Sequence, residues 1–501
     1  MTPSVAPALR EALQRADFTY DAVAELLGSR AHDALARNET TPGLLRTGGD
    51  QAGSPLATLV RLFLLQAPVS LTDAERALPG LVDRLAVAGL LEQSVSEVAA
   101  RLDCRPYAAD DEHLWVVSDL TPGLDGGPQR VGTDHVLGIS AASTSLAQLT
   151  RRAPVGRSLD LGTGCGVQAL HLAGHSDLVV ATDVNDRALR VARFNAALNG
   201  VADRVDVRDG SYFEPVRGEQ FDLIATNPPF VISPATGERL VYRDSGLPGD
   251  RVVEHIVRTA PEHLAPGGWC QVLANWVIDR DRAWDERLAE WLAPGHDALV
   301  VQREVLDPAS YVELWLKDAG LHGAPDYRER YETWLSWFDE QGIEAVGFGW
   351  VNVRRPDASE SDDRDPSVDL VEWPWDVEQP IAPAIGAWAD DAAASTGVGP
   401  DSLLAVAPDV VQETHGAAGA EDPETIVLRR QRGFRRARTV DTVEAALVGA
   451  CDGDLTVGAI LDAVAQLLEA DPAATRATYL PAAAELVAEG FLTPVAPADA
   501  R

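Results

Sequence analysis

The fold is decided by the segment Ser158-Leu159-Asp160-Leu161-Gly162-Thr163-Gly164-Cys165-Gly166, in which an apolar strand runs directly into a glycine-rich loop before a helix. Small loop residues let the backbone approach a ligand closely at the first crevice of an α/β sheet. The spacing is G-x-G-x-G, and Val167 stands where a dinucleotide fingerprint would place its third glycine, which counts against NAD and FAD. Taken alone, the loop is also compatible with an ordinary tight turn.

Carboxylates follow the next two strands as well. The second strand ends at Asp183-Val184, and the third ends at Asp209-Gly210. Asp183 is placed to accept hydrogen bonds from two ribose hydroxyls, and Asp209 can accept from an adenine amine. Each aspartate alone could be a helix N-cap. Their occurrence at successive strand ends favours a bound nucleoside.

Strands and helices alternate from about residue 107 to 353, which predicts an α/β fold with a largely parallel sheet covered on both faces. The expected strands are Leu114–Val117, Ser158–Leu161, Leu178–Thr182, Val205–Val207, Leu223–Thr226, Gln271–Ala274, Ala298–Gln302 and Ala345–Val353.

The fourth strand of this series ends at Asn227-Pro228-Pro229-Phe230. Together the four strand ends resemble a class I S-adenosylmethionine-dependent methyltransferase of the N-P-P-[FY] branch, and Asn195–Gly200 is also similar to that branch. Within it, the sequence is most similar to HemK-type release-factor glutamine methyltransferases and to small-domain ribosomal RNA base methyltransferases. The resemblance covers about residues 155–275 well and 107–353 loosely, and it covers neither end.

The resemblance implies a Rossmann-like, seven-stranded domain that binds S-adenosyl-L-methionine and no metal. By this resemblance the cofactor is held by Asp160, Gly162, Thr163, Gly164, Gly166, Asp183, Val184, Asp209, Gly210 and Asn227. The catalytic residues are Asn227, Pro228, Pro229 and Phe230. A Gly/Asp-rich segment at Arg243–Asp250 is similar in kind to one that HemK-type enzymes have there, and a plain loop is an equal alternative.

The Asn-Pro-Pro-Phe segment suits methylation of a planar nitrogen. The lone pair of an amide or base amine is delocalised, so the enzyme must hold both N–H groups while the nitrogen pyramidalises. The Asn227 Oδ1 and the Pro228 carbonyl offer two acceptors, the prolines fix the backbone, and Phe230 offers a stacking face. Positioning then supplies most of the rate, and no acid or base is required. A rigid turn after a strand is the alternative.

The charge of the chain limits its partners. The 42 Lys+Arg and 77 Asp+Glu give a net charge of −35, so nonspecific binding of polyanions is disfavoured. Six arginines and Phe434 are nevertheless concentrated in Arg429–Arg438. This segment predicts either a nucleic-acid contact or pairing with the acidic stretch at 357–378.

Cellular location is predicted from two further features. Cys104, Cys165, Cys270 and Cys451 form no C-x-x-C pair, as in a reducing cytosol. No apolar run approaches the roughly 20 residues of a membrane span. We therefore expect a cytoplasmic protein with no membrane contact.

Four domains are expected: a helical N-terminal domain (1–105), the methyltransferase domain (106–356), an acidic linker (357–395) and a helical C-terminal domain (396–501). Both ends have the helix order of a winged-helix unit, an outline that many small helical domains share. Between the last two core strands, aromatic residues at helical spacing are interpreted mainly as packing; they include Trp315, Tyr327, Tyr331, Trp334, Trp337 and Phe338.

The leading hypothesis is transfer of a methyl group to a protein glutamine amide, as in release-factor enzymes. An exocyclic amine of a ribosomal RNA, tRNA or DNA base is the alternative, and a small-molecule substrate comes third. From another class, a nucleic-acid-binding regulator that only senses the cofactor is also considered. The intact Asn227–Phe230 motif argues against the regulator, because a sensor has no need to grip an amine.

Overall fold

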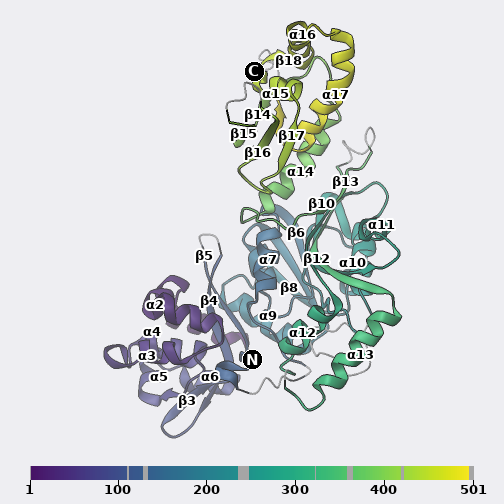
Figure 1. Cartoon of the computed structure of the whole chain (residues 1–501). Helices are drawn as coiled ribbons and strands as arrows, with labels where there is room; N and C mark the ends of the chain where they lie inside the picture. The colour runs from purple at the N-terminus through teal and green to yellow at the C-terminus, as the bar shows by residue number, and fades with distance from the viewer. Residues whose placement is uncertain are drawn as a thin grey trace.

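The protein is described by a computed structural model over residues 2–109, 112–127, 132, 134–234, 248–321, 323–357, 365–418 and 423–495. Within these residues, a central sheet of eight strands lies between an N-terminal and a C-terminal unit (Figure 1). The strand order is β13-β11-β12-β10-β9-β6-β7-β8. The strands are β6 (Val155–Leu161), β7 (Ser176–Asp183), β8 (Val205–Asp209), β9 (Phe221–Thr226), β10 (Leu264–Asp279), β11 (Asp297–Leu306), β12 (Ile343–Arg354) and β13 (Val368–Glu372).

Five neighbouring strands, β10-β9-β6-β7-β8, run parallel, and β12 is antiparallel to both β10 and β11. Helices cover both faces, as a parallel sheet requires. One face packs against α7 (Ala141–Leu149), α8 (Val167–Ala173), α9 (Asp186–Leu198) and α14 (Ala382–Ser395). The other packs against α10 (Arg251–Thr259) and α11 (Trp284–Ala289). The predicted α/β class I fold is confirmed.

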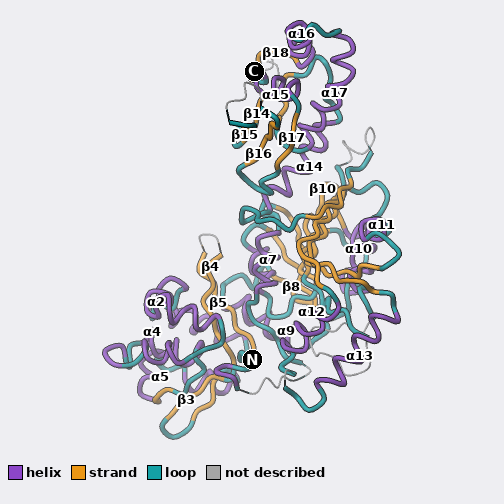
Figure 2. The backbone as a smooth tube through the Cα atoms, in the orientation of Figure 1, coloured by secondary structure: helices purple, strands orange, loops and turns teal. Residues whose placement is uncertain are grey.

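The expected linker at 357–395 is wrong, because this segment supplies both β13 and α14 (both labelled in Figure 1, and α14 drawn as a helix in Figure 2). Strand β13 extends the expected seven strands to eight by pairing in parallel with β11. Its Leu370 and Val371 pack on opposite faces of the sheet, and Ile385 and Trp388 of α14 are buried. The acidic residues of this stretch obscured its short apolar pattern in the sequence.

The N-terminal unit contains six α-helices in its described residues and a small antiparallel sheet of order β1-β3-β2. The helices are α1 (Ala6–Arg15), α2 (Tyr20–Ala36), α3 (Thr41–Arg46), α4 (Pro55–Leu59), α5 (Leu71–Ala77) and α6 (Val82–Ala88). The strands are β1 (Val69–Ser70), β2 (Leu91–Gln93) and β3 (Glu97–Ala100). The succession from α4 to β3 has the outline of a winged helix.

The helices of the C-terminal unit are accompanied by two three-stranded sheets in its described part, β18-β14-β19 and β15-β16-β17. Its elements are β14 (Leu403–Val406), β15 (Val410–His415), β16 (Thr425–Arg430), β17 (Ala437–Val440), α15 (Thr442–Ala450), β18 (Asp452–Thr456), α16 (Val457–Leu467), α17 (Pro472–Ala488) and β19 (Leu492–Pro494). Helix α15 begins with a reciprocal capping box between Asp441 and Glu444.

A β-hairpin of β4 (Leu102–Ala109) and β5 (Glu112–Asp119) joins the N-terminal unit to the central domain. The expected domain boundary at 105/106 is therefore wrong, since it cuts β4. The expected core strand at Leu114–Val117 is also wrong: it is part of β5, which pairs with β4 outside the central sheet. Its apolar run is buried by helices instead, and this explains why it resembled a core strand.

Asn195 of α9 and Asn199, the residue that directly follows this helix, bind the free edge of the hairpin. Asn195 exchanges hydrogen bonds with the backbone of Val117 (2.9 and 2.8 Å), and Asn199 does the same with Trp115 (2.9 and 2.8 Å). Each amide group thus acts as one residue of a neighbouring strand. Asn195 also donates to the Cys165 carbonyl of the glycine loop (2.7 Å). The asparagines recognised in the sequence therefore tie the hairpin to the loop.

The N-terminal unit and α9 share one apolar core. Phe194 and Leu198 of α9 pack in the same buried cluster as Leu9, Leu13 and Phe18. The indole N–H of Trp115 donates to the backbone carbonyl of Phe18 (2.7 Å). The N-terminal unit is thus continuous with the central domain in its packing. No helix within the described residues is long and apolar enough to cross a membrane.

Candidate active site

The glycine loop turns tightly between β6 and α8. The N–H groups of Gly162 and Thr163 both donate to the Thr182 carbonyl of β7 (2.9 and 2.8 Å). Gly166 has a φ of +86°, and a side chain there would lie 3.2 Å from the Ala192 backbone of α9. Glycine is therefore needed at Gly166 for both its conformation and the close approach of two helices.

Asp160 lies beneath this loop and is almost completely buried. Its Oδ2 accepts from the Thr163 hydroxyl and from the Ala169 N–H (2.9 Å). Burial outweighs these hydrogen bonds and raises the pKa of Asp160 to about 7. The carboxyl group therefore braces the loop from within and carries a proton under mildly acidic conditions.

Asp160 gives the stability of the protein a pH dependence of definite sign. Because its pKa is raised from 3.8 to about 7 on folding, the folded chain keeps a proton that the unfolded chain releases. The stability that this retained proton contributes is fully present below the unfolded pKa of 3.8. It is lost as the pH rises through the folded pKa of about 7. Asp160→Asn removes the charge, and its Oδ1 can accept both existing hydrogen bonds.

We therefore expect Asp160→Asn to gain stability over the wild type as the pH rises from about 5 to about 8. Urea unfolding of both proteins at the two pH values measures this difference in unfolding free energy. A difference that does not change with pH would contradict the assignment.

Asp183 and Asp209 stand side by side at the ends of β7 and β8, where they are register partners. The Asp183 carboxylate accepts from the Gly164 N–H (2.9 Å) and from the Asn185 N–H (2.8 Å), and the Gly210 N–H donates to its carbonyl (3.1 Å). Burial raises the pKa of Asp183, against these hydrogen bonds. Asp209 is exposed, and so is Val184.

The register of the sheet brings the Asn-Pro-Pro-Phe segment to the same edge. Leu161 at the end of β6 pairs with Thr182 of β7 and with Thr226 of β9. The Thr226 hydroxyl donates to the Leu161 carbonyl (2.7 Å), so β9 ends beside the glycine loop. The predicted site residues therefore lie together along neighbouring strand ends.

Asn227 carries the most informative polar atom of this edge. Its Oδ1 is buried and has no hydrogen-bond partner among the described residues. A buried acceptor without a donor costs about 1–3 kcal/mol. A donor that reaches this atom would recover that energy. Pro228 is buried beside it, Pro229 is partly exposed, and the half-buried ring of Phe230 lies edge-on to Trp315, with 6.2 Å between ring centres.

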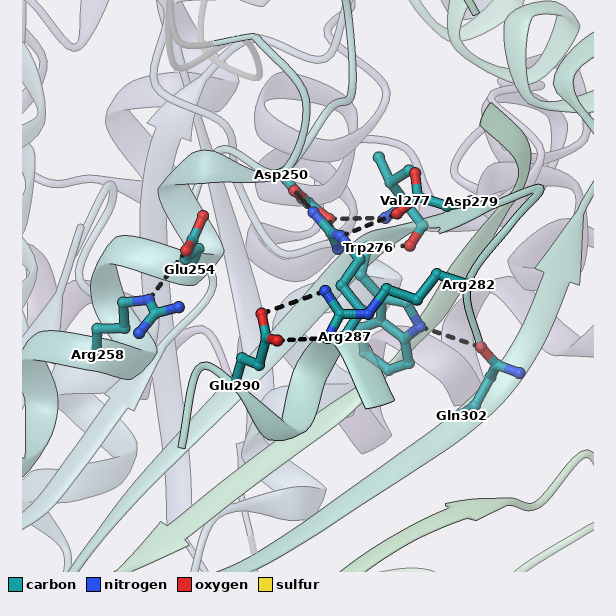
Figure 3. Close-up of polar contacts among 10 residues, drawn as sticks. All are labelled: Asp250, Glu254, Arg258, Trp276, Val277, Asp279, Arg282, Arg287, Glu290 and Gln302. Carbon is teal, nitrogen blue, oxygen red and sulfur yellow. Dashed lines mark hydrogen bonds and ion pairs between the residues drawn. The ribbon is translucent and has the colours of Figure 1, made fainter. Parts of the chain in front are cut away.

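Next to this edge, a buried ion pair fixes the far end of β10 (Figure 3). Arg287 of α11 donates both terminal nitrogens to the carboxylate of Asp250 (2.7 and 2.8 Å), which also accepts from the Val277 N–H (2.7 Å). The Trp276 indole donates to Gln302 (3.0 Å). Of the segment Arg243–Asp250, residues 243–247 lie outside the described residues. Asp250 has a structural role.

The aromatic insertion forms two helices, α12 (Pro308–Asp318) and α13 (Tyr327–Glu340). Trp334 and Phe338 are buried in one cluster with Tyr311, as the interpretation as packing predicted. That cluster also includes Val231 and Ile232, which directly follow the Asn-Pro-Pro-Phe segment. Sequence reasoning missed this contact, and only the spacing of the aromatic residues hinted at a packed helix.

Four of the six arginines in the arginine-rich segment pair with carboxylates of the same molecule. Arg429 pairs with Glu413, Arg430 with Asp409 and Arg432 with Glu378, while Arg438 lies among three glutamates. The Arg432 pair is the predicted pairing with the acidic stretch. The segment also lines a cavity of about 330 Å³ beside α14, none of whose lining residues belongs to the four strand ends. A nucleic-acid contact at this segment is unsupported.

The sheet order, the glycine loop and the carboxylates at successive strand ends define a class I methyltransferase domain. Residues 138–292 match the family described as "Methyltransferase small domain". The flanking ranges 15–101 and 386–494 match two domain families of unknown function, DUF7059 and DUF7782. Among the described residues, no group of His, Cys, Asp or Glu side chains could hold a metal ion.

Curated relatives match about a quarter of the chain. The ribosomal protein uL3 glutamine methyltransferase of Bradyrhizobium diazoefficiens is 39% identical over 124 residues, which are 23% of this chain and 39% of that protein. The release factor glutamine methyltransferase of Xylella fastidiosa is 36% identical over 132 residues, 24% of this chain and 47% of that protein.

The similar enzyme of Thermosynechococcus vestitus is 33% identical over 153 residues, which are 28% of this chain and 51% of that protein. The chain thus spans about half the length of these relatives, or less. A solved ribosomal protein L11 methylase of Lactobacillus delbrueckii subsp. bulgaricus is 17% identical with a TM-score of 0.25, over 43% of this chain and 77% of that one, and this likeness carries no functional information.

Proposed function

We propose that the protein transfers a methyl group from S-adenosyl-L-methionine to the side-chain amide nitrogen of a glutamine in a protein of the translation machinery. The observation that carries the proposal is the buried Asn227 Oδ1, which has no donor among the described residues and lies three residues before Phe230, whose ring is half-buried. A primary amide supplies both the missing donor and a planar group for the ring.

The residues at the strand ends fit the proposed cofactor. Asp183 uses each carboxylate oxygen once for a backbone N–H, and its remaining lone pairs can accept from two ribose hydroxyls. Asp209 and Gly210 would take the adenine, and Gly162–Gly166 would admit the rest of the ligand closely. Bound here, the sulfonium of S-adenosyl-L-methionine supplies an electrophilic methyl group.

The contribution of the protein itself is to position the acceptor amide. Asn227 Oδ1 and the Pro228 carbonyl accept the two amide N–H groups, and this frees the nitrogen lone pair as the nitrogen pyramidalises. The face of the Phe230 ring stacks against the plane of the amide. These interactions strengthen as the bond to the methyl group forms, so they raise the rate beyond what binding alone would give. Once methylated, the amide nitrogen is acidic and releases its extra proton to water, so the step needs no dedicated base.

Three observations favour a protein acceptor over a nucleic acid. The net charge is −35, and four of the six arginines in 429–438 are already paired with carboxylates. The named relatives act on a release factor and on ribosomal protein uL3.

The test is methyl transfer from radiolabelled S-adenosyl-L-methionine to purified release factors, ribosomal protein uL3, ribosomal RNA, tRNA and DNA. We expect label in a protein, with mass spectrometry of its peptides locating the methyl group on a glutamine. Label confined to nucleic acid would overturn the proposed acceptor. Absence of cofactor binding would overturn the proposed reaction.

A further inference from the structure

The segment that follows Phe230 is anchored in the helical insertion rather than in the sheet. Ile232 is fully buried, and its N–H donates to the phenolic oxygen of Tyr311 on α12 (2.9 Å). Residues 227–234 are not paired in any strand of the sheet. This bond therefore attaches the backbone just past the acceptor motif to an element outside the matched range 138–292.

Tyr311 is itself rigidly held. Its side chain is fully buried, and its ring contacts Trp315, Phe338 and Phe348 at 5.7–6.0 Å between ring centres. The Asn275 amide of β10 lies 3.4 Å from the hydroxyl. Burial raises the pKa of Tyr311 far above its ordinary value, so the hydroxyl remains neutral and can accept from Ile232 at any physiological pH.

A second contact from the same helix reaches Phe230 directly. Trp315 lies one helical turn after Tyr311 and meets the Phe230 ring edge-on, at 6.2 Å and 66°. Helix α12 thus contacts both Phe230 and the backbone two residues beyond it. Along the chain, one contact is made at Phe230 and the other at Ile232, so Val231 lies between them.

We propose that Tyr311 is a positioning residue for the acceptor site, which sets the backbone after Phe230 and thereby the ring that holds the acceptor amide. The inference rests on the proposed function, because the acceptor is the glutamine amide named there. It assigns the insertion a part in the reaction: the helices that interrupt the end of the sheet determine where the acceptor sits.

The test compares Tyr311→Phe with Tyr331→Phe in the full-length protein. Tyr331 is a matched control, since it lies in the same insertion and its hydroxyl bonds only to Glu313 among the described residues (2.9 Å). Both changes remove one hydroxyl and keep the ring. We expect Tyr311→Phe to lower kcat about tenfold, because small displacements of a positioned group are costly, while cofactor affinity stays unchanged. Tyr331→Phe should match the wild type in both measurements.

Hydrogen exchange supplies a readout that does not depend on activity. Peptides covering 227–234 should exchange faster in Tyr311→Phe than in wild type, and peptides covering 160–170 should not change. If wild type methylates a glutamine and Tyr311→Phe keeps a normal kcat, the positioning role is overturned and the proposed function stands. If no acceptor protein is methylated, the proposed function fails, and unchanged exchange at 227–234 would separately overturn the anchoring by Tyr311.

Discussion

Replacing Asn227 with alanine is expected to lower the turnover of methyl transfer by about 10²–10³-fold, by analogy with the removal of one oxyanion-hole donor. The interaction of Asn227 Oδ1 with the acceptor nitrogen matters most as that nitrogen pyramidalises, so kcat falls. Cofactor affinity should remain close to that of wild type, because Asp183 and the glycine loop are untouched. Steady-state kinetics on the methylated protein and calorimetry of cofactor binding measure the two effects.

Variants of Phe230 are the matched comparison. Phe230→Tyr keeps the ring face and should retain activity, whereas Phe230→Ala should raise KM for the acceptor more than it lowers kcat. Near-normal turnover of Asn227→Ala on the true substrate would exclude the amine-holding mechanism. An oxygen, carbon or thiol acceptor would then be the better interpretation.

Asp183→Ala is expected to weaken S-adenosyl-L-methionine binding by about 10²-fold or more. Hydrogen bonds to a charged acceptor contribute about 1.5–3 kcal/mol each, and two ribose hydroxyls would lose such an acceptor. The change also removes the acceptor of the Gly164 N–H and so loosens the glycine loop. Calorimetry of wild type and variant gives the dissociation constants.

The control is Asp177→Ala, an exposed aspartate at the opposite end of the same strand, β7. It should leave the affinity unchanged. Equal affinities for wild type and Asp183→Ala would rule out the ribose assignment. Tight binding of NAD would contradict the assignment of S-adenosyl-L-methionine as the cofactor.

The central fold was predictable because its signals are local. A glycine loop after an apolar strand and carboxylates at later strand ends are read directly from neighbouring residues, and the register of a parallel sheet then gathers them at one edge. Strand β13 escaped prediction because its five residues, two of them acidic, lie in a stretch whose composition resembles a linker.

Features that depend on distant partners could not be predicted. The arginines of 429–438 also pair with Glu413, Asp409 and Glu489, which no sequence pattern indicated, and only the pairing with the stretch 357–378, through Glu378, was predicted. Likewise, nothing near Ile232 in the sequence indicates that its N–H bonds to Tyr311, 79 residues further along the chain.

The hydrogen bonds from Asn195 and Asn199 to the β4–β5 hairpin restrict how the N-terminal unit and the central domain can be combined during evolution. The hairpin lies in the gap between the two matched ranges 15–101 and 138–292, so neither family by itself includes it. Its backbone is nevertheless satisfied by Asn195 and Asn199 on one side, and Trp115 bonds to Phe18 on the other. A gene fusion that joined the two families at their borders, without the hairpin, would leave the Asn195 and Asn199 amides and the Phe18 carbonyl without these hydrogen-bond partners. We therefore expect chains that carry the N-terminal unit to keep both asparagines, and a loss of either to coincide with a loss or remodelling of that unit.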